Sequence, residues 1–98
     1  MNYRDYLSGF QGSFCSVNWA SNSVIRIGIL PEEFRNDQAR ANDFCNERSS
    51  FSNPCHVGVV EEVGADFICI SYPGSSNVLS IPLMRVITFE YAVEDMPK

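Results

Sequence analysis

The residues of this chain best suited to covalent or metal chemistry are four cysteines and a single histidine. Cys55 and His56 are adjacent, so the pair could in principle act as nucleophile and base, and Cys45 could join them as a zinc ligand. Adjacent residues of a strand point to opposite faces, however, which separates the two side chains. Zinc motifs also use more closely paired ligands. We therefore expect neither a Cys–His enzyme nor a metal site.

The spacing of the cysteines favours a structural role. Successive cysteines are separated by 29, 9 and 13 residues without a CxxC motif, and four cysteines allow three intrachain pairings. Cys45 and Cys55 flank the polar residues 46–54, so a disulfide between them would either close this loop or link neighbouring subunits. Cys69 falls in an apolar strand pattern, which predicts a small core or half-buried residue. The sequence leaves the redox state of Cys15 and the pairing of all four cysteines open.

The other candidates for catalysis have structural explanations. Glu61 and Glu62 would point to opposite faces of a strand, and Glu32 and Glu33 suit the positively polarised start of a helix. The six glycines are dispersed along the chain, so they form no phosphate-binding loop. We expect a protein that is not an enzyme and needs no cofactor.

The composition fits one domain, residues 1–98, with 45% hydrophobic and 19% charged residues. The net charge is -5 and the seven basic residues are scattered, which disfavours nucleic-acid binding because that depends on concentrated positive charge. No apolar run approaches the roughly 20 residues that cross a bilayer. The first residues also lack the apolar core of a signal peptide. We expect cytoplasmic synthesis without a signal peptide, and no membrane partner.

Strand patterns dominate the chain. Residues 13–20 and 24–30 predict a hairpin with its turn at residues 21–23, in which Gly28 is a bulge or a bend. Residues 56–63, 66–72, 78–81 and 84–91 predict four further strands, with turns between them. Pro82 cannot donate to a sheet ladder, so it predicts an edge or a strand boundary.

Two segments depart from the strand pattern. Tyr3, Tyr6 and Phe10 recur at helical spacing and predict a short N-terminal helix. Residues 31–55 form a polar insertion, in which we expect a helix from about residue 32 to residue 45. One face of that helix would carry Phe34, Gln38, Ala41 and Cys45. The insertion also holds three phenylalanines that are costly to leave in water and that we name as candidate interface residues: Phe34, Phe44 and Phe51.

Short strands separated by turns favour a small barrel or a sandwich over a parallel sheet. The sequence resembles small Sm-like and SH3-like barrel domains of spore-forming bacteria, including spore coat-associated proteins. Three features carry the resemblance: a glycine that begins a strand, a VG-D-F turn, and an IP pair before the final strand. The matching positions are Gly58, Val63-Gly64, Asp66-Phe67 and Ile81-Pro82. The resemblance covers residues 56–91 well and 14–30 loosely. It implies a mainly β small barrel of five to six strands, with a short N-terminal helix and a helical or loop insertion.

Three functions are compatible with these features. The first is a structural protein that assembles with itself into an oligomer, layer or filament, in a spore coat if the resemblance holds. The second is an Sm-like RNA-binding ring, which the topology favours and the acidic charge opposes. The third is a peptide-binding adaptor anchored by Trp19, Tyr72 and Tyr91, although its strand position predicts that Trp19 is a core residue. We favour self-assembly, with Cys45 and Cys55 as candidate cross-links.

Overall fold

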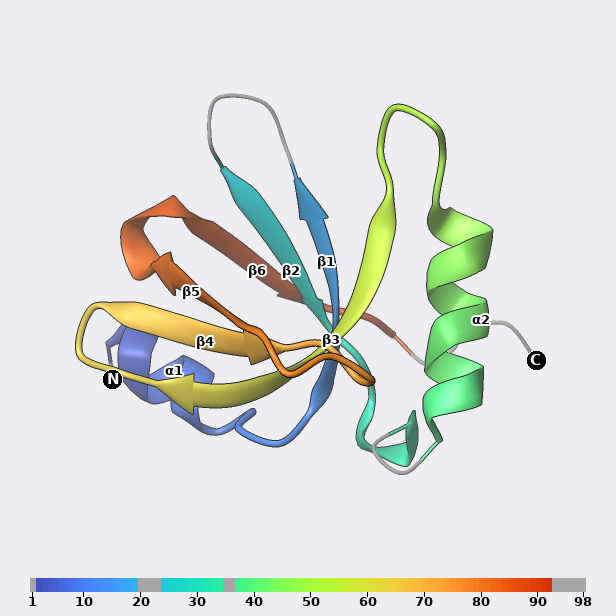
Figure 1. Ribbon diagram of the computed structural model, residues 1–98. Helices are drawn as coiled ribbons and strands as arrows, with labels where there is room; N and C mark the ends of the chain where they lie inside the picture. The colour runs from blue at the N-terminus through green and yellow to red at the C-terminus, as the bar shows by residue number, and fades with distance from the viewer. Residues whose placement is uncertain (1, 20–23, 35–36, 93–98) are drawn as a thin grey trace.

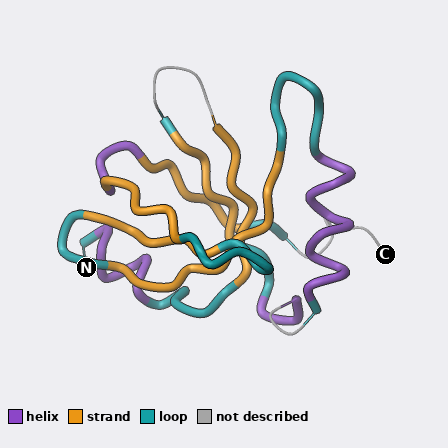
Figure 2. The backbone as a smooth tube through the Cα atoms, viewed as in Figure 1, coloured by secondary structure: helices purple, strands orange, loops and turns teal. Residues whose placement is uncertain are grey.

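The protein is mainly β in a computed structural model that describes residues 2–19, 24–34 and 37–92. Figure 1 and Figure 2 show a curved sheet with one short helix on either side. The elements in chain order are α1 (Tyr3–Ser8), β1 (Phe14–Trp19), β2 (Ile25–Ile29), the 3-10 turn η1 (Glu32–Phe34), α2 (Gln38–Arg48), β3 (Cys55–Val63), β4 (Phe67–Ser71), β5 (Val78–Pro82), the 3-10 turn η2 (Leu83–Arg85) and β6 (Val86–Glu90). The predicted class, with a short N-terminal helix and a helical insertion, is confirmed.

The six strands form one sheet in the order β5-β4-β3-β1-β2-β6. All neighbours are antiparallel except β2 and β6, which are parallel. The sequence neighbours β5 and β6 therefore lie at opposite ends of the sheet, although η2 joins them (Figure 1). No ladder connects β5 to β6 in the part of the chain that the structure describes, so the sheet is not closed. The predicted barrel is not confirmed.

Local predictions about the strands were mostly accurate. β1 and β2 form the predicted hairpin, and its predicted turn at residues 21–23 lies outside the described residues. Pro82 ends the edge strand β5, as expected. The irregularity in the ladders lies between Val60 and Glu62 of β3, whereas Gly28 pairs in continuous register. The bulge predicted as one alternative at Gly28 is therefore absent.

The inner face of the sheet holds the larger core. Strand alternation places Cys15, Val17 and Ile27 on this face, and all three are fully buried. From α1, Leu7 is also fully buried in this cluster, so the helix covers one end of the core. The other buried members are Ile25, Ile29, Val60, Val63, Ile68, Ile70, Ile81 and Val86.

The outer face of the sheet is the one on which α2 packs. The expected helix from residue 32 to 45 is instead the turn η1 followed by α2, which begins after Asp37, whose carboxylate accepts a hydrogen bond from Arg40 N at 3.0 Å. The helix buries Ala41 and Cys45 as expected, but Gln38 is exposed. A second cluster forms here from Leu30, Phe34, Ala41, Phe44, Cys45, Cys55 and Val57.

Two of the three candidate interface phenylalanines belong to this second cluster. Phe34 and Phe44 are 0% exposed, so neither can contact a partner while α2 stays docked. Both are core residues, and the interface prediction was wrong for them. Phe51, in the loop after α2, is fully exposed and remains a candidate.

A disulfide joins Cys45 of α2 to Cys55 of β3 within the chain, with their Cα atoms 5.3 Å apart. The predicted pair is confirmed, and the structure shows its intrachain form, so these two cysteines are not available as intersubunit cross-links. Cys15 and Cys69 are free thiols, the first buried and the second half-buried as its strand pattern predicted.

We expect loss of the disulfide to destabilise the fold without abolishing it. The bond closes a short loop, so removing it by Cys45→Ala with Cys55→Ala should lower the free energy of unfolding by roughly 2–3 kcal/mol through the entropy of the unfolded chain. Denaturant unfolding of the oxidised, reduced and double-variant proteins measures this loss. Cys69→Ala is the control, and equal stabilities before and after reduction would contradict the prediction.

Cys15 should make stability fall at alkaline pH. Burial raises the pKa of its thiol to about 12 from 9.0, although a hydrogen bond with the Gly58 backbone lowers it. The thiol of the unfolded chain therefore ionises at a lower pH than the buried thiol. The stability that the buried neutral thiol contributes is intact below pH 9 and is lost as the pH rises towards 12. Unfolding free energies measured across that range should decline more steeply for the wild type than for Cys15→Ala. Parallel curves would contradict the assignment.

Candidate functional site

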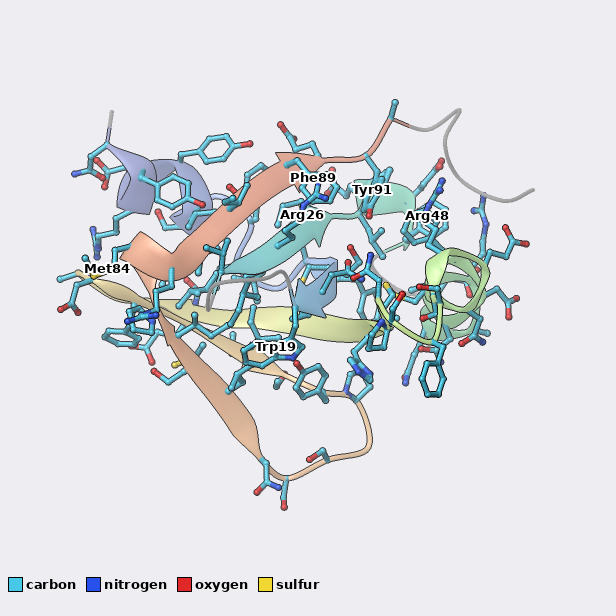
Figure 3. All side chains as sticks on the ribbon, turned by 90° about the horizontal axis from the view of Figure 1, so that it is seen from above. Trp19, Arg26, Arg48, Met84, Phe89 and Tyr91 are labelled. Atoms are coloured by element: carbon cyan, nitrogen blue, oxygen red, sulfur yellow. A yellow bond between two sulfur atoms is a disulfide. The ribbon has the colours of Figure 1, made fainter. Side chains whose placement is uncertain are left out.

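The outer face carries a pocket between β2, β6 and α2, which we call the arginine pocket (Figure 3). Its volume is about 250 Å³. Six side chains from five parts of the chain line it: Asn18, Arg26, Arg48, Asn53, Phe89 and Tyr91. Two are cations, two are amides and two are aromatic rings, so the lining combines positive charge with an apolar floor.

Strand register explains why the residues of this pocket meet. Asn18 of β1 pairs with Arg26 of β2, and Gly28 of β2 pairs with Phe89 of β6. Paired residues point to the same face, and positions two apart return to it, so β1, β2 and β6 present these side chains together. Tyr91 continues the row because its N–H donates to Ile29 O at 3.1 Å.

Aromatic rings hold both arginines. The guanidinium carbon of Arg26 lies 5.1 Å from the centroid of the Phe89 ring. That of Arg48 lies 4.4 Å from Phe44 and 5.6 Å from Tyr91. Cation–π attraction of this kind restricts a guanidinium without using its N–H donors. The two cations are therefore positioned before any ligand arrives.

The rings themselves form a connected row. Tyr91 makes edge-to-face contacts with Phe44 and Phe89, with centroids 4.6 Å and 4.9 Å apart. Its hydroxyl is 3.2 Å from Ser16 Oγ. Since Phe44 is a core residue of α2, Tyr91 links the floor of the pocket to the second cluster.

Gly28 allows the rings to lie directly on the sheet. A Cβ at this position would stand 2.7 Å from Ser16 Oγ and 2.9 Å from Phe89 Cε2, and would also collide with the Tyr91 ring. The close approach of these atoms is thus what requires a glycine at this position.

Electrostatics distinguish this pocket from the rest of the protein. The chain has a net charge of -5, yet the described residues that line the pocket include two arginines and no acid. One of its amides is held as well, since Asn18 Nδ2 donates to Pro54 O at 3.0 Å. The lining offers donors but no nucleophile, so the arrangement is suited to binding an anion.

A second and larger pocket, of about 490 Å³, lies where α1 meets η2. Its arginine is already engaged, because Arg4 Nε donates to Gly64 O at 3.1 Å and Arg4 Nη1 lies 3.5 Å from Asp5 Oδ1. Its lining residues are Asn2, Tyr3, Arg4, Ala65, Asp66, Pro82, Leu83 and Met84. Because Asp66 also lines it and Asp5 pairs with Arg4, this pocket is less positively charged than the arginine pocket.

The aromatic anchors proposed for an adaptor do not meet in one groove. Tyr72 packs against the inner core and Tyr91 against the outer cluster. Trp19 is 51% exposed at the end of β1 and lies apart from Tyr91 (Figure 3), so the prediction that it is a core residue was wrong.

The sequence analysis did not identify Arg26 as a binding residue. The signal that could have identified it is that Arg26 is a lone charge within an apolar strand.

The Cys–His pair is separated as expected. Cys55 belongs to the outer cluster and is disulfide-bonded, whereas His56 is exposed, with its ring 6.2 Å from that of Tyr72. Within the described ranges, no group of three or more histidine, cysteine, aspartate or glutamate side chains could hold a metal ion.

Enlarging Gly28 should disturb the pocket and the fold together. Gly28→Ala forces Tyr91 and Phe89 to shift, and we expect it to lower the free energy of unfolding by roughly 1–3 kcal/mol. Gly9→Ala is the control, since its Cβ would come no closer than 3.4 Å to its nearest neighbour, Tyr6 O. Thermal or denaturant unfolding compares the stabilities of the two variants. A Gly28→Ala protein as stable as the wild type would contradict the close approach of the rings to this position.

No helix in the described part of the chain is long and apolar enough to span a membrane. The sequence matches no known protein family, no curated protein and no solved structure at a significant level.

Proposed function

We propose that this chain is a noncatalytic structural protein that assembles with itself, and that the contact begins at the edge strand β5. The observation that carries the proposal is the state of this edge. β5 pairs with β4 on one side, and no strand among the described residues pairs with its other side. An unpaired edge offers a row of backbone donors and acceptors to another chain.

The side chains of β5 do little to prevent such pairing. Its sequence, VLSIP, has no charged residue. Val78 is 55% exposed and Ser80 is exposed. Natural edge strands are usually protected by charges, bulges or proline, and here the only such residue is Pro82 at the end of the strand. The centre of the edge is therefore open to a partner.

The other edge strand, β6, is by contrast covered by α1. From α1, Tyr3 Oη donates to Val86 O at 3.2 Å and lies 2.9 Å from Thr88 Oγ1. Tyr6 Oη donates to Glu90 Oε2 at 3.1 Å. These contacts place α1 along β6, so β5 is the edge that can accept a second copy.

Pairing of β5 with β5 would be isologous, with Ser80 at the two-fold axis because it is the middle residue of Val78–Pro82. Growth beyond a dimer needs further apolar contacts. Exposed side chains suited to them among the described residues include Phe51, Met84, Ile87 and Trp19. Because Cys45 and Cys55 are bonded within the chain, the assembly we propose does not depend on intersubunit disulfides.

The finer points of fold and setting are part of the same proposal. We propose that the sheet is a small-barrel variant of the SH3-like and Sm-like class whose two ends meet at η2 without pairing. The resemblance of residues 56–91 to spore coat-associated domains supports a coat layer as the setting. An RNA-binding ring is less well supported, because the net charge of -5 opposes it.

A charge at the centre of β5 should prevent assembly. Size-exclusion chromatography with light scattering should show a wild-type dimer or larger species, with or without reductant. Ser80→Lys should shift it to monomer, because two lysines would face each other across the two-fold axis. Asn42→Lys, on the exposed side of α2, adds the same charge elsewhere and should leave assembly intact. A wild type that stays monomeric at all concentrations would overturn the proposal.

A further inference from the structure

We propose that Phe51 of one copy inserts into the pocket between α1 and η2 of another copy, and that this contact extends the assembly beyond the β5 dimer. The inference rests on the proposed self-assembly and names a second contact for it. Its starting point is the side chain of Phe51, which is fully exposed in the loop between α2 and β3. A large apolar side chain in water is stabilised by a partner surface that buries it.

The loop that carries Phe51 is held at its tip and at its base. At the tip, Ser50 N–H donates to Asn53 O and Asn53 N–H donates to Ser50 O, both at 3.2 Å, which closes a tight turn. At the base, Cys55 N–H donates to Ser49 Oγ at 2.8 Å, and the disulfide ties α2 to β3. Phe51 is therefore presented on a preorganised turn, so less conformational entropy is lost when it binds.

The pocket between α1 and η2 has the size and lining for an aromatic ring. Its volume is about 490 Å³, whereas a cavity of roughly 150 Å³ binds benzene, so the ring of Phe51 fits with part of its turn. Tyr3, Leu83 and Met84 are among the described residues that line the pocket. Met84 is 91% exposed, and its flexible thioether is suited to contact with an aromatic ring.

The charges near the two features allow two copies of an acidic chain to approach. The turn, residues 49–54, has the uncharged sequence SSFSNP, so its insertion adds no like-charge repulsion. Near the turn, Glu47 of α2 is exposed, and beside the pocket Arg85 of η2 is exposed. Opposite charges at the rims of two surfaces favour their encounter.

The turn and the pocket lie at opposite ends of the molecule. Figure 1 shows the loop between α2 and β3 on one side and α1 with η2 on the other, and Figure 3 shows Met84 at the end away from α2. One copy can therefore accept the turn of a second copy and offer its own turn to a third. A contact between two different patches propagates in this way.

The small area of this contact explains how it would cooperate with β5. An aromatic side chain buries roughly 150–250 Å², below the roughly 1,000 Å² that a specific interface needs. One such contact joins two monomers only weakly. In β5 dimers it occurs more than once between the same partners, which strengthens it without any new contact.

An NMR dilution series on the Ser80→Lys variant tests the contact apart from β5. At about 1 mM, within reach of a weak contact, the backbone signals of residues 49–53 and of Met84 should shift relative to the dilute protein. Phe51→Ser in this background should abolish both sets of shifts. Ile87→Ser is the matched control, because it removes another exposed apolar side chain that lies outside the described lining. Absent shifts, shifts that persist in the Phe51 variant, or equal losses in the Ile87 variant would overturn the proposal.

Sizing by light scattering tests the role of the contact in assembly. The wild type and Ile87→Ser should form species larger than a dimer, whereas Phe51→Ser and Met84→Ser should stop at the dimer. A wild type no larger than a dimer, or Phe51→Ser assemblies as large as those of the wild type, would overturn the inference. A monomeric wild type overturns β5 pairing but not the Phe51 contact, which the dilution series measures by itself.

Discussion

Docking of α2 on the outer face of the sheet is the interaction on which both the fold and the arginine pocket depend. Phe34 and Phe44 are fully buried there, and burying a large apolar side chain is worth roughly 1.5–3 kcal/mol. The Cys45–Cys55 disulfide fixes the helix to β3 next to them. Without this docking, Val57 and Leu30 would lose their cover, and Arg48 would leave the pocket.

The same helix explains why a structural core and a binding surface share residues. Tyr91 contacts Phe44 beneath it and lines the pocket above it. A change in how α2 sits must therefore move the pocket floor. This coupling also restrains Arg48, because its guanidinium lies against both of these rings. The pocket is preorganised by core contacts, which lowers the entropy that a ligand must overcome.

The sequence predicted the elements better than their arrangement. Alternation and turn residues located the six strands and the hairpin because those signals are local. The parallel pairing of β2 with β6 joins segments about sixty residues apart, and no local pattern specifies it. The arginine pocket depends on that pairing, so it could not be foreseen from residues 25–29 or 86–90 alone. The prediction that Trp19 is a core residue failed for a related reason. Alternation predicts which face of the sheet a residue occupies, but not whether anything covers the end of the strand.

The contrast between the two edge strands follows from this topology. β5 and β6 are consecutive in the chain and are joined by η2, yet they are the two edge strands of the sheet. Tyr3 of α1 contacts β6, and the edge of β5 is left to solvent or to a partner. Backbone pairing at such an edge has little intrinsic selectivity, since every extended chain offers the same donors and acceptors. The arginine pocket is built from side chains, so it can discriminate by charge and shape. The two surfaces thus differ in what they can recognise.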